Sequence, residues 1–372
     1  MSAPRVVLVG AHGHGRGHLE AIARLHAAGR LRLAGVADPR PLDPGQRALA
    51  GDAALSPDAT ELIQAVAPDV VVLVTPVHTH VELAEAAMRA GAHLLLEKPP
   101  APTLAGLGRL LTVQRETGRV VQVGFQAFGS GAVTELRRRI ADGELGEIHA
   151  IGGTGLWWRG EAYWNRSGWA GRRSIDGVPV NDGALTNPFA HAVALAVALD
   201  GSGGAEPVRR VELDTYRTRA SEAHDTASAR IVTARRTPVT VAATLCAETE
   251  TEPTVTVYGS RDTAELHYTE DRLVTATGAT RHGRTDLLED LLDHLAGASA
   301  GPLVPLADTL AFTQVAEAVL AAPAPTAVDQ EAFDDLPGLT RRAAATGRLY
   351  RETGARWATA APFTWTPEGT TA

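Results

Sequence analysis

Lys98 is the residue whose type most clearly points to chemistry, because it is the only lysine among the 35 Lys and Arg residues of the chain. Arginine supplies the positive charge everywhere else. A retained lysine therefore indicates a place where a compact ammonium group is needed and a planar guanidinium is unsuitable. Lys98 follows the apolar run Leu94–Leu96 and Glu97, where a buried strand is expected to end. The alternative interpretation is an ordinary surface lysine in a loop.

A second pair of candidate residues lies beside an Ala- and Val-rich segment. Asn187 and His191 are four residues apart, a spacing that places two side chains on one face of a helix. An imidazole titrates near neutral pH and can accept or return a hydroxyl proton. The amide of Asn187 can orient a bound group but cannot take up a proton. The alternative for His191 is a buried core histidine.

A glycine-rich turn, Gly10-Ala11-His12-Gly13-His14-Gly15, follows the first apolar run and precedes a helical pattern. Such a turn presents backbone N–H groups and a helix N-terminus to a pyrophosphate. Against the pattern G-x-G-x-x-G, His12 stands at the middle glycine. Either Gly13 replaces that glycine through a one-residue shift, or the turn is looser. An ordinary tight turn without a ligand is the alternative interpretation.

Asp38 ends the second apolar run, 28 residues after Gly10. A carboxylate at this position accepts the ribose hydroxyls of adenosine and repels a 2'-phosphate, so it favours NAD over NADP. Arg40 lies two residues later and can neutralise such a phosphate, which leaves NADP possible.

The elements that must position these groups alternate along the first third of the chain. Apolar strands separated by helices predict a parallel sheet covered on both faces, and thus a Rossmann-like, doubly wound domain over residues 1–124. Ligands bind beyond the carboxyl ends of such strands. Strands are predicted at Arg5–Val9, Leu31–Ala37, Asp69–Val74, His93–Glu97 and Val120–Gly124, with helices at Gly17–Ala28, Ala59–Val66, His78–Ala90 and Leu104–Thr117.

Residues 125–372 show a different rhythm, with alternating runs that follow one another closely. This pattern predicts an α+β domain with an open, largely antiparallel sheet that binds substrate and presents an exposed face. A long helix is predicted at Ala184–Leu199. Helices at Asp286–Leu295 and Leu306–Leu320 are expected to complete this second domain.

All three asparagines and four of the six tryptophans fall within residues 157–187. Aromatic planes interleaved with Arg, Asn and Asp suit a sugar or cyclitol, because ring faces stack on indoles while hydroxyls need donors and acceptors. The same arginines can hold a carboxylate or a phosphate. The alternative is a Trp-rich seam between domains or subunits. The substrate-binding candidates are Trp158, Arg159, Tyr163, Trp164, Trp169 and Arg172.

Composition excludes several other classes of protein. The net charge of -8 argues against a nucleic-acid or membrane partner, and a lone cysteine, Cys246, excludes a disulfide framework and is expected to be inert core. No basic-then-apolar leader opens the sequence, so a cytoplasmic location is expected. We expect no metal site, because the spacing of His12, His14 and His18 offers no carboxylate or thiol partner.

Several of these motifs together resemble the Gfo/Idh/MocA family of oxidoreductases. The resemblance rests on the opening turn with His18, Thr75–His80, Glu97-Lys98-Pro99, Val123-Gly124-Phe125 and Asn187-x-x-x-His191. Each motif alone is weak, but the ordered set is specific and covers most of the chain, most strongly its first 150 residues.

The resemblance implies roles for the matching positions. Lys98 would hydrogen-bond the reacting hydroxyl and the nicotinamide ribose. The Lys98–Pro99 peptide bond that follows it is expected to be cis. His191 would be the general acid/base, and Asn187 would orient the substrate at a position that is Asp in many relatives. Cofactor contacts are expected from Gly10, His12, Gly13, His14, Gly15, Asp38, Arg40, Thr75, Pro76, His78, His80, Glu97, Lys98 and Gln126. For His78 and His80, helix capping is the alternative.

The expected function is transfer of a hydride between NAD, or alternatively NADP, and a secondary alcohol or ketone of a sugar, inositol or related compound. One rival is an NAD-using glycoside hydrolase or lyase that oxidises its substrate transiently. Another is a non-catalytic nucleotide-binding regulator. The resemblance also implies that residues 125–372 form the oligomerisation domain, with a homodimer or homotetramer assembled through the exposed face of its sheet.

Overall fold

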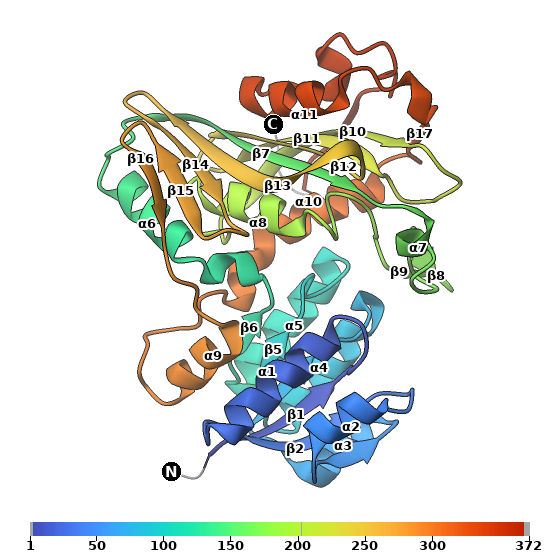
Figure 1. Ribbon diagram of the computed structural model, residues 1–372, viewed down its shortest axis with the longest axis vertical. Coiled ribbons are helices and arrows are strands. Elements are labelled where there is room, and N and C mark those ends of the chain that lie inside the picture. Colours follow the sequence, from blue (N-terminus) through green and yellow to red (C-terminus); the bar gives the residue numbers. More distant parts are fainter. Residues whose placement is uncertain (1–2, 202, 368–372) are drawn as a thin grey trace. The chain divides into compact units, whose positions relative to one another are not determined.

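The computed structural model describes residues 3–201 and 203–367, and this part of the chain forms two compact units (Figure 1). The first unit contains the chain up to Ala101 together with Ala105–Gly124 and Leu287–Leu306. The second unit contains Pro102–Leu104, Phe125–Asp286 and the chain from Ala307 onward.

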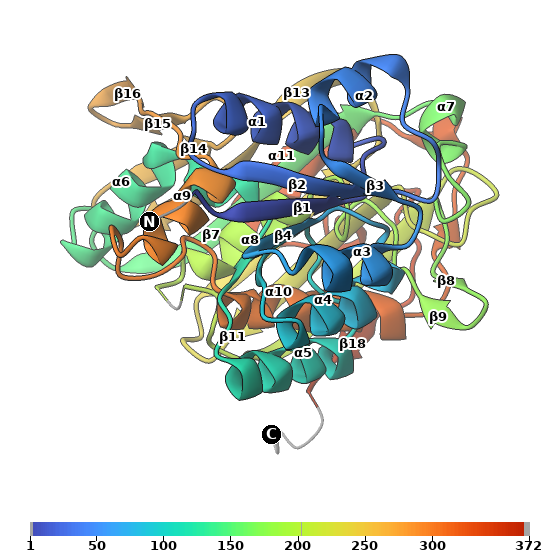
Figure 2. The same ribbon diagram turned by 90° about the horizontal axis from the view of Figure 1, so that it is seen from below.

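The first unit is built on a parallel sheet with the strand order β3-β2-β1-β4-β5-β6, which is the Rossmann order and confirms the predicted fold class. Figure 2 shows helices α1 and α2 on one face of this sheet and α3, α4 and α5 on the other. Its elements are β1 (Arg5–Val9), α1 (Gly15–Ala27), β2 (Arg32–Ala37), α2 (Pro44–Ala50), β3 (Ala54–Ser56), α3 (Ala59–Val66), β4 (Val70–Leu73), η1 (Val77–Thr79), α4 (His80–Arg89), β5 (His93–Leu96), α5 (Leu104–Thr117), β6 (Val121–Val123) and α9 (Leu287–Leu295).

Helix α2 and strand β3 were not predicted from the sequence. Residues 44–50 are too few to show a helical period, but their first turn carries a readable start signal. The side chain of Asp43 accepts a hydrogen bond from the backbone N of Gln46, and the side-chain Oε1 of Gln46 accepts one from the backbone N of Asp43. Pro44 occupies the first helical position. This capping box with an N-terminal proline is sufficient to begin a helix.

One predicted assignment is wrong: residues 287–306 belong to the first unit and not to the second. The side chain of Gln122 in β6 explains the difference. Fully buried Gln122 donates to the carbonyl of Leu287 at 3.1 Å and to Asp290 at 2.7 Å, and it accepts from the backbone N of Val304 at 2.8 Å. Because a buried amide must find partners, these bonds tie α9 to the edge of the parallel sheet.

The second unit contains a mixed, mostly antiparallel sheet with the order β16-β15-β14-β13-β7-β12-β11-β10-β17, and β18 pairs with β10. Its elements are η2 (Gln126–Gly129), α6 (Gly131–Ala141), β7 (Ile148–Trp158), α7 (Glu161–Trp164), β8 (Ser174–Ile175), β9 (Val178–Pro179), α8 (Ala190–Ala198), β10 (Val208–Arg217), β11 (Thr226–Thr233), β12 (Pro238–Thr244), β13 (Cys246–Gly259), β14 (Thr263–His267), β15 (Arg272–Thr275), β16 (Gly278–Arg281), η3 (Leu306–Thr309), α10 (Leu310–Ala321), β17 (Thr326–Ala327), η4 (Gln330–Ala332), α11 (Leu336–Thr346), η5 (Tyr350–Glu352) and β18 (Phe363–Trp365).

One face of this sheet packs on α8 and α10, while α11 lies on the opposite face (Figure 1). An exposed sheet face was expected from the sequence, whereas the face opposite α8 and α10 is covered by α11 over β7 and β12. A buried cluster joins the sheet to α11 and to the chain that follows it. Its members include Tyr216 of the sheet, Leu339 of α11, and Tyr350 and Trp357 of the following chain. Gly152 of β7 permits the close approach, since a Cβ there would lie 2.8 Å from the carbonyl oxygen of Ala344. Cys246 is part of the same cluster, as predicted for a core cysteine.

Within the described residues, no helix is both long and apolar enough to cross a membrane.

Candidate functional site

The glycine-rich turn of the first unit leads directly into α1. Gly10 has φ +89°, and a Cβ there would lie 2.5 Å from the carbonyl oxygen of Val74. A Cβ at Gly15 would overlap the carbonyl of Gly10. Gly13 has a positive φ of +58°, and nothing lies within 4 Å of the place where its Cβ would be. Only glycine fits the contacts at positions 10 and 15, so the backbone itself forms the surface beyond β1 there.

Asp38 lies directly after β2 and faces this turn. Its Oδ2 accepts from the backbone N of Ala11 at 2.9 Å and lies 2.9 Å from Nδ1 of His12. Its Oδ1 accepts from the backbone N of Arg40 at 2.9 Å and from Nε of Arg40 at 3.3 Å. Burial acts to raise the pKa of Asp38, but the contacts with His12, Arg40 and Ala11 outweigh it and lower the pKa to about 2. The carboxylate is therefore ionised at neutral pH.

Gln46 is a positioning residue that the sequence analysis missed. Its buried side-chain amide donates to the carbonyl of Ala11 at 2.7 Å, so this bond connects α2 to the glycine-rich turn. The capping pattern of Asp43, Pro44 and Gln46 is the signal that locates it.

The segment from the end of β4 to the first residue of α4 contains the predicted residues Thr75, Pro76, His78 and His80. His80 is buried, and its Nδ1 lies 2.8 Å from the carbonyl oxygen of Pro99 while its Nε2 lies 2.7 Å from that of Thr75. His80 thus joins the loops after β4 and β5, and burial lowers its pKa. Nδ1 of His78 is buried with no hydrogen-bond partner among the described residues, as expected for a polar atom that meets a ligand.

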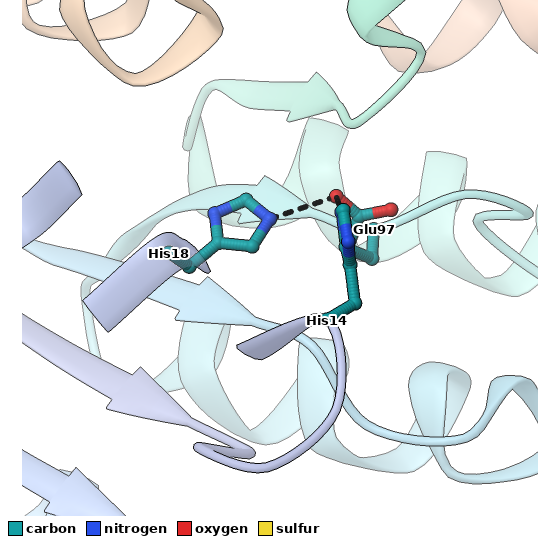
Figure 3. A group of neighbouring side chains, drawn as sticks. All are labelled: His14, His18 and Glu97. Carbon is teal, nitrogen blue, oxygen red and sulfur yellow. Dashed lines mark hydrogen bonds and ion pairs between the residues drawn. The ribbon is translucent and has the colours of Figure 1, made fainter. Parts of the chain in front are cut away.

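Glu97 and Lys98 follow β5 at the same edge of the sheet, and the Lys98–Pro99 bond is cis, as predicted. Oε1 of Glu97 lies 2.9 Å from Nε2 of His18 and 3.4 Å from Nε2 of His14 (Figure 3). Burial acts to raise the pKa of Glu97, but the two imidazoles outweigh it and hold the pKa well below its ordinary value. The bond to Glu97 raises the pKa of His14. The sequence offered no carboxylate beside these histidines, whereas the fold supplies one.

These groups fit a dinucleotide. The turn has no side chain at its glycines to block the approach of a diphosphate, and the side chain of the N-cap residue His14 does not cap the backbone N–H groups of the first turn of α1. The ionised Asp38 stands after β2, where a ribose is held in Rossmann domains. Lys98 lies after β5 at the carboxyl edge of the sheet.

In the second unit, Asn187 and His191 do not share a helix, because α8 begins only at Ala190. The predicted helix over 184–189 is replaced by turns, since Pro188 has no N–H to donate. His191 lies in the first turn of α8, with its ring centroid 5.7 Å from that of Phe125 and 6.4 Å from that of Tyr268. Tyr268 was not a sequence candidate. Gln126 lies in η2, and its carbonyl accepts from Arg284 at 2.9 Å.

Asp182 organises the turns before α8. Its buried carboxylate accepts from the amide of Asn187 at 2.9 Å, from the backbone N of Gly171 at 2.8 Å and from Arg166 at 3.2 Å. The amide nitrogen of Asn187 is thereby engaged, so its side-chain orientation is fixed by Asp182. This role of Asp182 was not predicted from the sequence.

His224 fixes the same turns from the other side. Its Nε2 accepts from the backbone N of Leu185 at 3.1 Å, and its carbonyl accepts from Ala184 at 3.0 Å. A Cβ at Gly183 would overlap the imidazole. Burial lowers the pKa of His224 to about 4, so the ring is neutral and can act as the acceptor.

The aromatic and arginine residues of the 157–173 segment stack on one another. The guanidinium carbon of Arg166 lies 3.8 Å from the ring centroid of Tyr163 and 4.5 Å from that of Trp169. The side chain of Arg159 pairs with Glu250 at 3.0 Å. Nε1 of Trp164 donates to the backbone carbonyl of Arg159 at 2.9 Å. Arg159 and Arg166 are therefore already paired with acids. Trp158 and Arg172 are the exposed members of the predicted substrate-binding set.

Comparisons with known proteins agree with this geometry. Residues 4–125 match the model described as the oxidoreductase family with an NAD-binding Rossmann fold, and residues 133–265 match the Gfo/Idh/MocA C-terminal domain. Among solved structures, the fold is similar to the WlbA dehydrogenase of Bordetella pertussis in complex with NADH and UDP-GlcNAcA, with TM-score 0.70, 23% identity and coverage of 85% of this chain and 95% of that one. The apo scyllo-inositol dehydrogenase of Lactobacillus casei gives TM-score 0.67, 16% identity and coverage of 86% and 95%.

Curated relatives match over shorter stretches. D-glucoside 3-dehydrogenase of Escherichia coli is 33% identical over 99 residues, which are 27% of this chain and 28% of that protein. Inositol 2-dehydrogenase 4 of Saccharopolyspora erythraea is 37% identical over 145 residues, which are 38% of this chain and 42% of that protein. Each match spans less than half of the relative. Because the two family models together cover more than half of the chain, it belongs to the Gfo/Idh/MocA family of oxidoreductases, with an NAD-binding Rossmann domain.

Proposed function

We propose that this protein is an NAD-dependent dehydrogenase or reductase that interconverts a secondary alcohol and a ketone on a sugar, an inositol or a related polyhydroxylated compound. The observation that carries the proposal is the match of both units to one oxidoreductase family, combined with the ionised Asp38 and with Lys98 at the edge of the parallel sheet. The names of the relatives, which include glucoside and inositol dehydrogenases, support the substrate class.

The bound nicotinamide would supply the hydride acceptor, and the residues of this chain would manage the proton. In the oxidative direction, the carbinol C–H bond breaks with transfer of hydride, the O–H proton passes to Nε2 or Nδ1 of His191, and a C=O bond forms. Lys98 would donate a hydrogen bond to the same oxygen and stabilise its developing negative charge. Asn187, oriented by Asp182, would bind a neighbouring hydroxyl.

The preference for NAD follows from Asp38. A carboxylate held at a pKa of about 2 is ionised throughout the physiological range and repels a 2'-phosphate. The side chain of Arg40 is 67% exposed and pairs with Asp38, so its charge is partly neutralised. Both features favour NAD.

The substrate segment fits a ligand with apolar ring faces and many hydroxyls. Trp158 is 44% exposed, which leaves an indole face accessible, and Arg172 of the same 157–173 segment is also exposed. Apolar ring faces stack on indoles, and arginine donates hydrogen bonds to hydroxyl or carboxylate oxygens.

The test is an assay of nicotinamide absorbance with NAD and NADP against a panel of inositols, aldoses and sugar acids. Lys98→Ala and His191→Ala are each expected to lower kcat about 100- to 10,000-fold on the active compound, whereas Arg115→Ala, on the exposed face of α5, serves as the control with unchanged kcat. Cleaved sugar without net NADH would instead indicate the hydrolase or lyase. Full activity of the Lys98→Ala, His191→Ala double variant would refute the proposed roles.

A further inference from the structure

The side chains of His14, His18 and Glu97 form a compact cluster of potential metal ligands (Figure 3). One ligand atom from each residue lies within 4.8 Å of the others. His14 and His18 are four residues apart at the start of α1, so both rings lie on one side of the helix, and their centroids are 5.1 Å apart. Glu97 reaches them from the end of β5.

The distances in the cluster are close to those of a coordinated ion. A tetrahedral ion with bonds of about 2.0–2.1 Å holds its ligand atoms roughly 3.3 Å apart. Nε2 of His14 lies 3.4 Å from Oε1 of Glu97, and Nε2 of His18 lies 2.9 Å from the same oxygen. The side chain of His14 is 66% exposed, which leaves it room to rotate towards His18.

The carboxylate is held in place by groups that are not ligands. The backbone N of Lys98 donates to Oε2 of Glu97 at 3.1 Å, which leaves Oε1 directed at the two imidazoles. Gly124 packs against the carboxylate, because a Cβ there would lie 2.7 Å from Oε1. The side chain of Glu97 is only 6% exposed, and a buried carboxylate requires a cation or several donors beside it. Such outer contacts fix the orientation of a metal-binding carboxylate.

We propose that His14, His18 and Glu97 bind one divalent transition-metal ion of the Zn²⁺ or Co²⁺ type. Two imidazoles and one carboxylate are a donor set that suits these ions and disfavours Mg²⁺ and Ca²⁺, which prefer oxygen ligands. Three protein ligands leave at least one coordination position for water or another ligand. The site shares His14 and Glu97 with the expected dinucleotide contacts, but the metal-binding proposal does not depend on the dehydrogenase function.

The test uses the untagged full-length protein, treated with a chelator and free of dinucleotide. Co²⁺ binding is followed by visible absorbance and Zn²⁺ binding by calorimetry, and one ion per chain is expected. His14→Ala removes the exposed ligand while the bond between His18 and Glu97 remains. Loss of an outer-shell contact alone costs about 10- to 100-fold in metal affinity, so loss of this ligand is expected to cost at least that much.

His149→Ala is the matched control, because His149 is an exposed histidine outside the cluster, and its loss is expected to leave the affinity unchanged. Glu97→Gln removes the carboxylate charge and is expected to abolish binding. The proposal is wrong if the wild type binds neither ion at millimolar concentration, or if His14→Ala binds as tightly as the wild type while circular dichroism shows both to be folded. Since no dinucleotide is present, either result leaves the dehydrogenase assay as a separate question.

Discussion

Nδ1 of His12 lies 2.9 Å from Oδ2 of Asp38, so the side chain at the middle position of the glycine motif contacts the carboxylate after β2. Together with Ala11 and Arg40, His12 engages both oxygens of Asp38. A carboxylate offers about four acceptor positions, and a ribose diol needs two of them. His12 and the exposed guanidinium of Arg40 are the groups that can move aside when ribose binds.

Replacement of His12 by glycine is expected to tighten NADH binding by roughly tenfold, the equivalent of one net hydrogen bond of about 1.4 kcal/mol to a charged group. The physical reason is that Oδ2 of Asp38 would no longer be engaged by the imidazole before the ribose arrives. A fluorescence titration with NADH measures the change. Weaker binding by a His12→Gly variant that melts at the wild-type temperature would show that His12 instead contributes to the dinucleotide site.

Asp38→Asn is expected to reduce discrimination between the two dinucleotides. The amide keeps the shape of the side chain but loses the charge, so NADH affinity should fall about 10- to 100-fold while NADPH affinity falls less or rises. Parallel titrations of the variant and the wild type with both dinucleotides give the ratio. An unchanged ratio would mean that Asp38 does not face the ribose. Arg40→Ala provides the comparison, since it should lower NADPH affinity and leave NADH affinity nearly unchanged.

The buried His224 is expected to make the second unit acid-sensitive. Its folded pKa of about 4 lies below the ordinary value of 6.5, so the unfolded chain binds the proton more tightly. The contribution of neutral His224 to the free energy of unfolding is fully present above pH 6.5. It is lost as the pH falls towards 4, which lowers the free energy of unfolding by up to about 3 kcal/mol. Urea unfolding measured across this range should show stability falling with pH.

His224→Gln supplies the control for this prediction. Its amide oxygen can accept from the backbone N of Leu185, but it does not titrate. The variant should therefore lose part of the acid-dependent slope of unfolding free energy while keeping the fold at neutral pH. A slope identical to that of the wild type would contradict the assignment to His224.

The segment that covers the sheet of the second unit is expected to be essential for stability. Leu339 on the buried face of α11 packs in the cluster with Tyr216, Tyr350 and Trp357. Leu339→Ala should lower the free energy of unfolding by about 2–4 kcal/mol, because it leaves a cavity in that cluster. Arg341→Ala, on the exposed face of the same helix, should change it by less than about 0.5 kcal/mol. Equal effects of the two variants in thermal and urea unfolding would mean that α11 does not remain on the sheet.

The sequence alone was sufficient to predict the Rossmann-like parallel sheet of the first unit and its main helices, but not α2, β3 or the placement of α9 in this unit. Local patterns in the sequence indicate buried strands, amphipathic helices and tight turns without knowledge of the rest of the fold. Examples are the apolar run Val6–Val9, the helical period of Ala59–Val66 and the glycines of the first turn. Asp38 and Lys98 could be located in the same way, because the carboxyl end of a parallel strand is a defined place in this fold.

The tertiary structure alone decided which distant residues meet. Glu97 joins His18 across 79 residues of sequence, and Gln122 attaches Asp290 to the first unit across 168. His224 and Asp182 fix the turns around Asn187 in the same way. Local periodicity reports only which face of an element is buried. Contacts between buried polar groups depend on how strands and helices pack, because each such group must find whichever partner the completed fold brings within hydrogen-bonding distance.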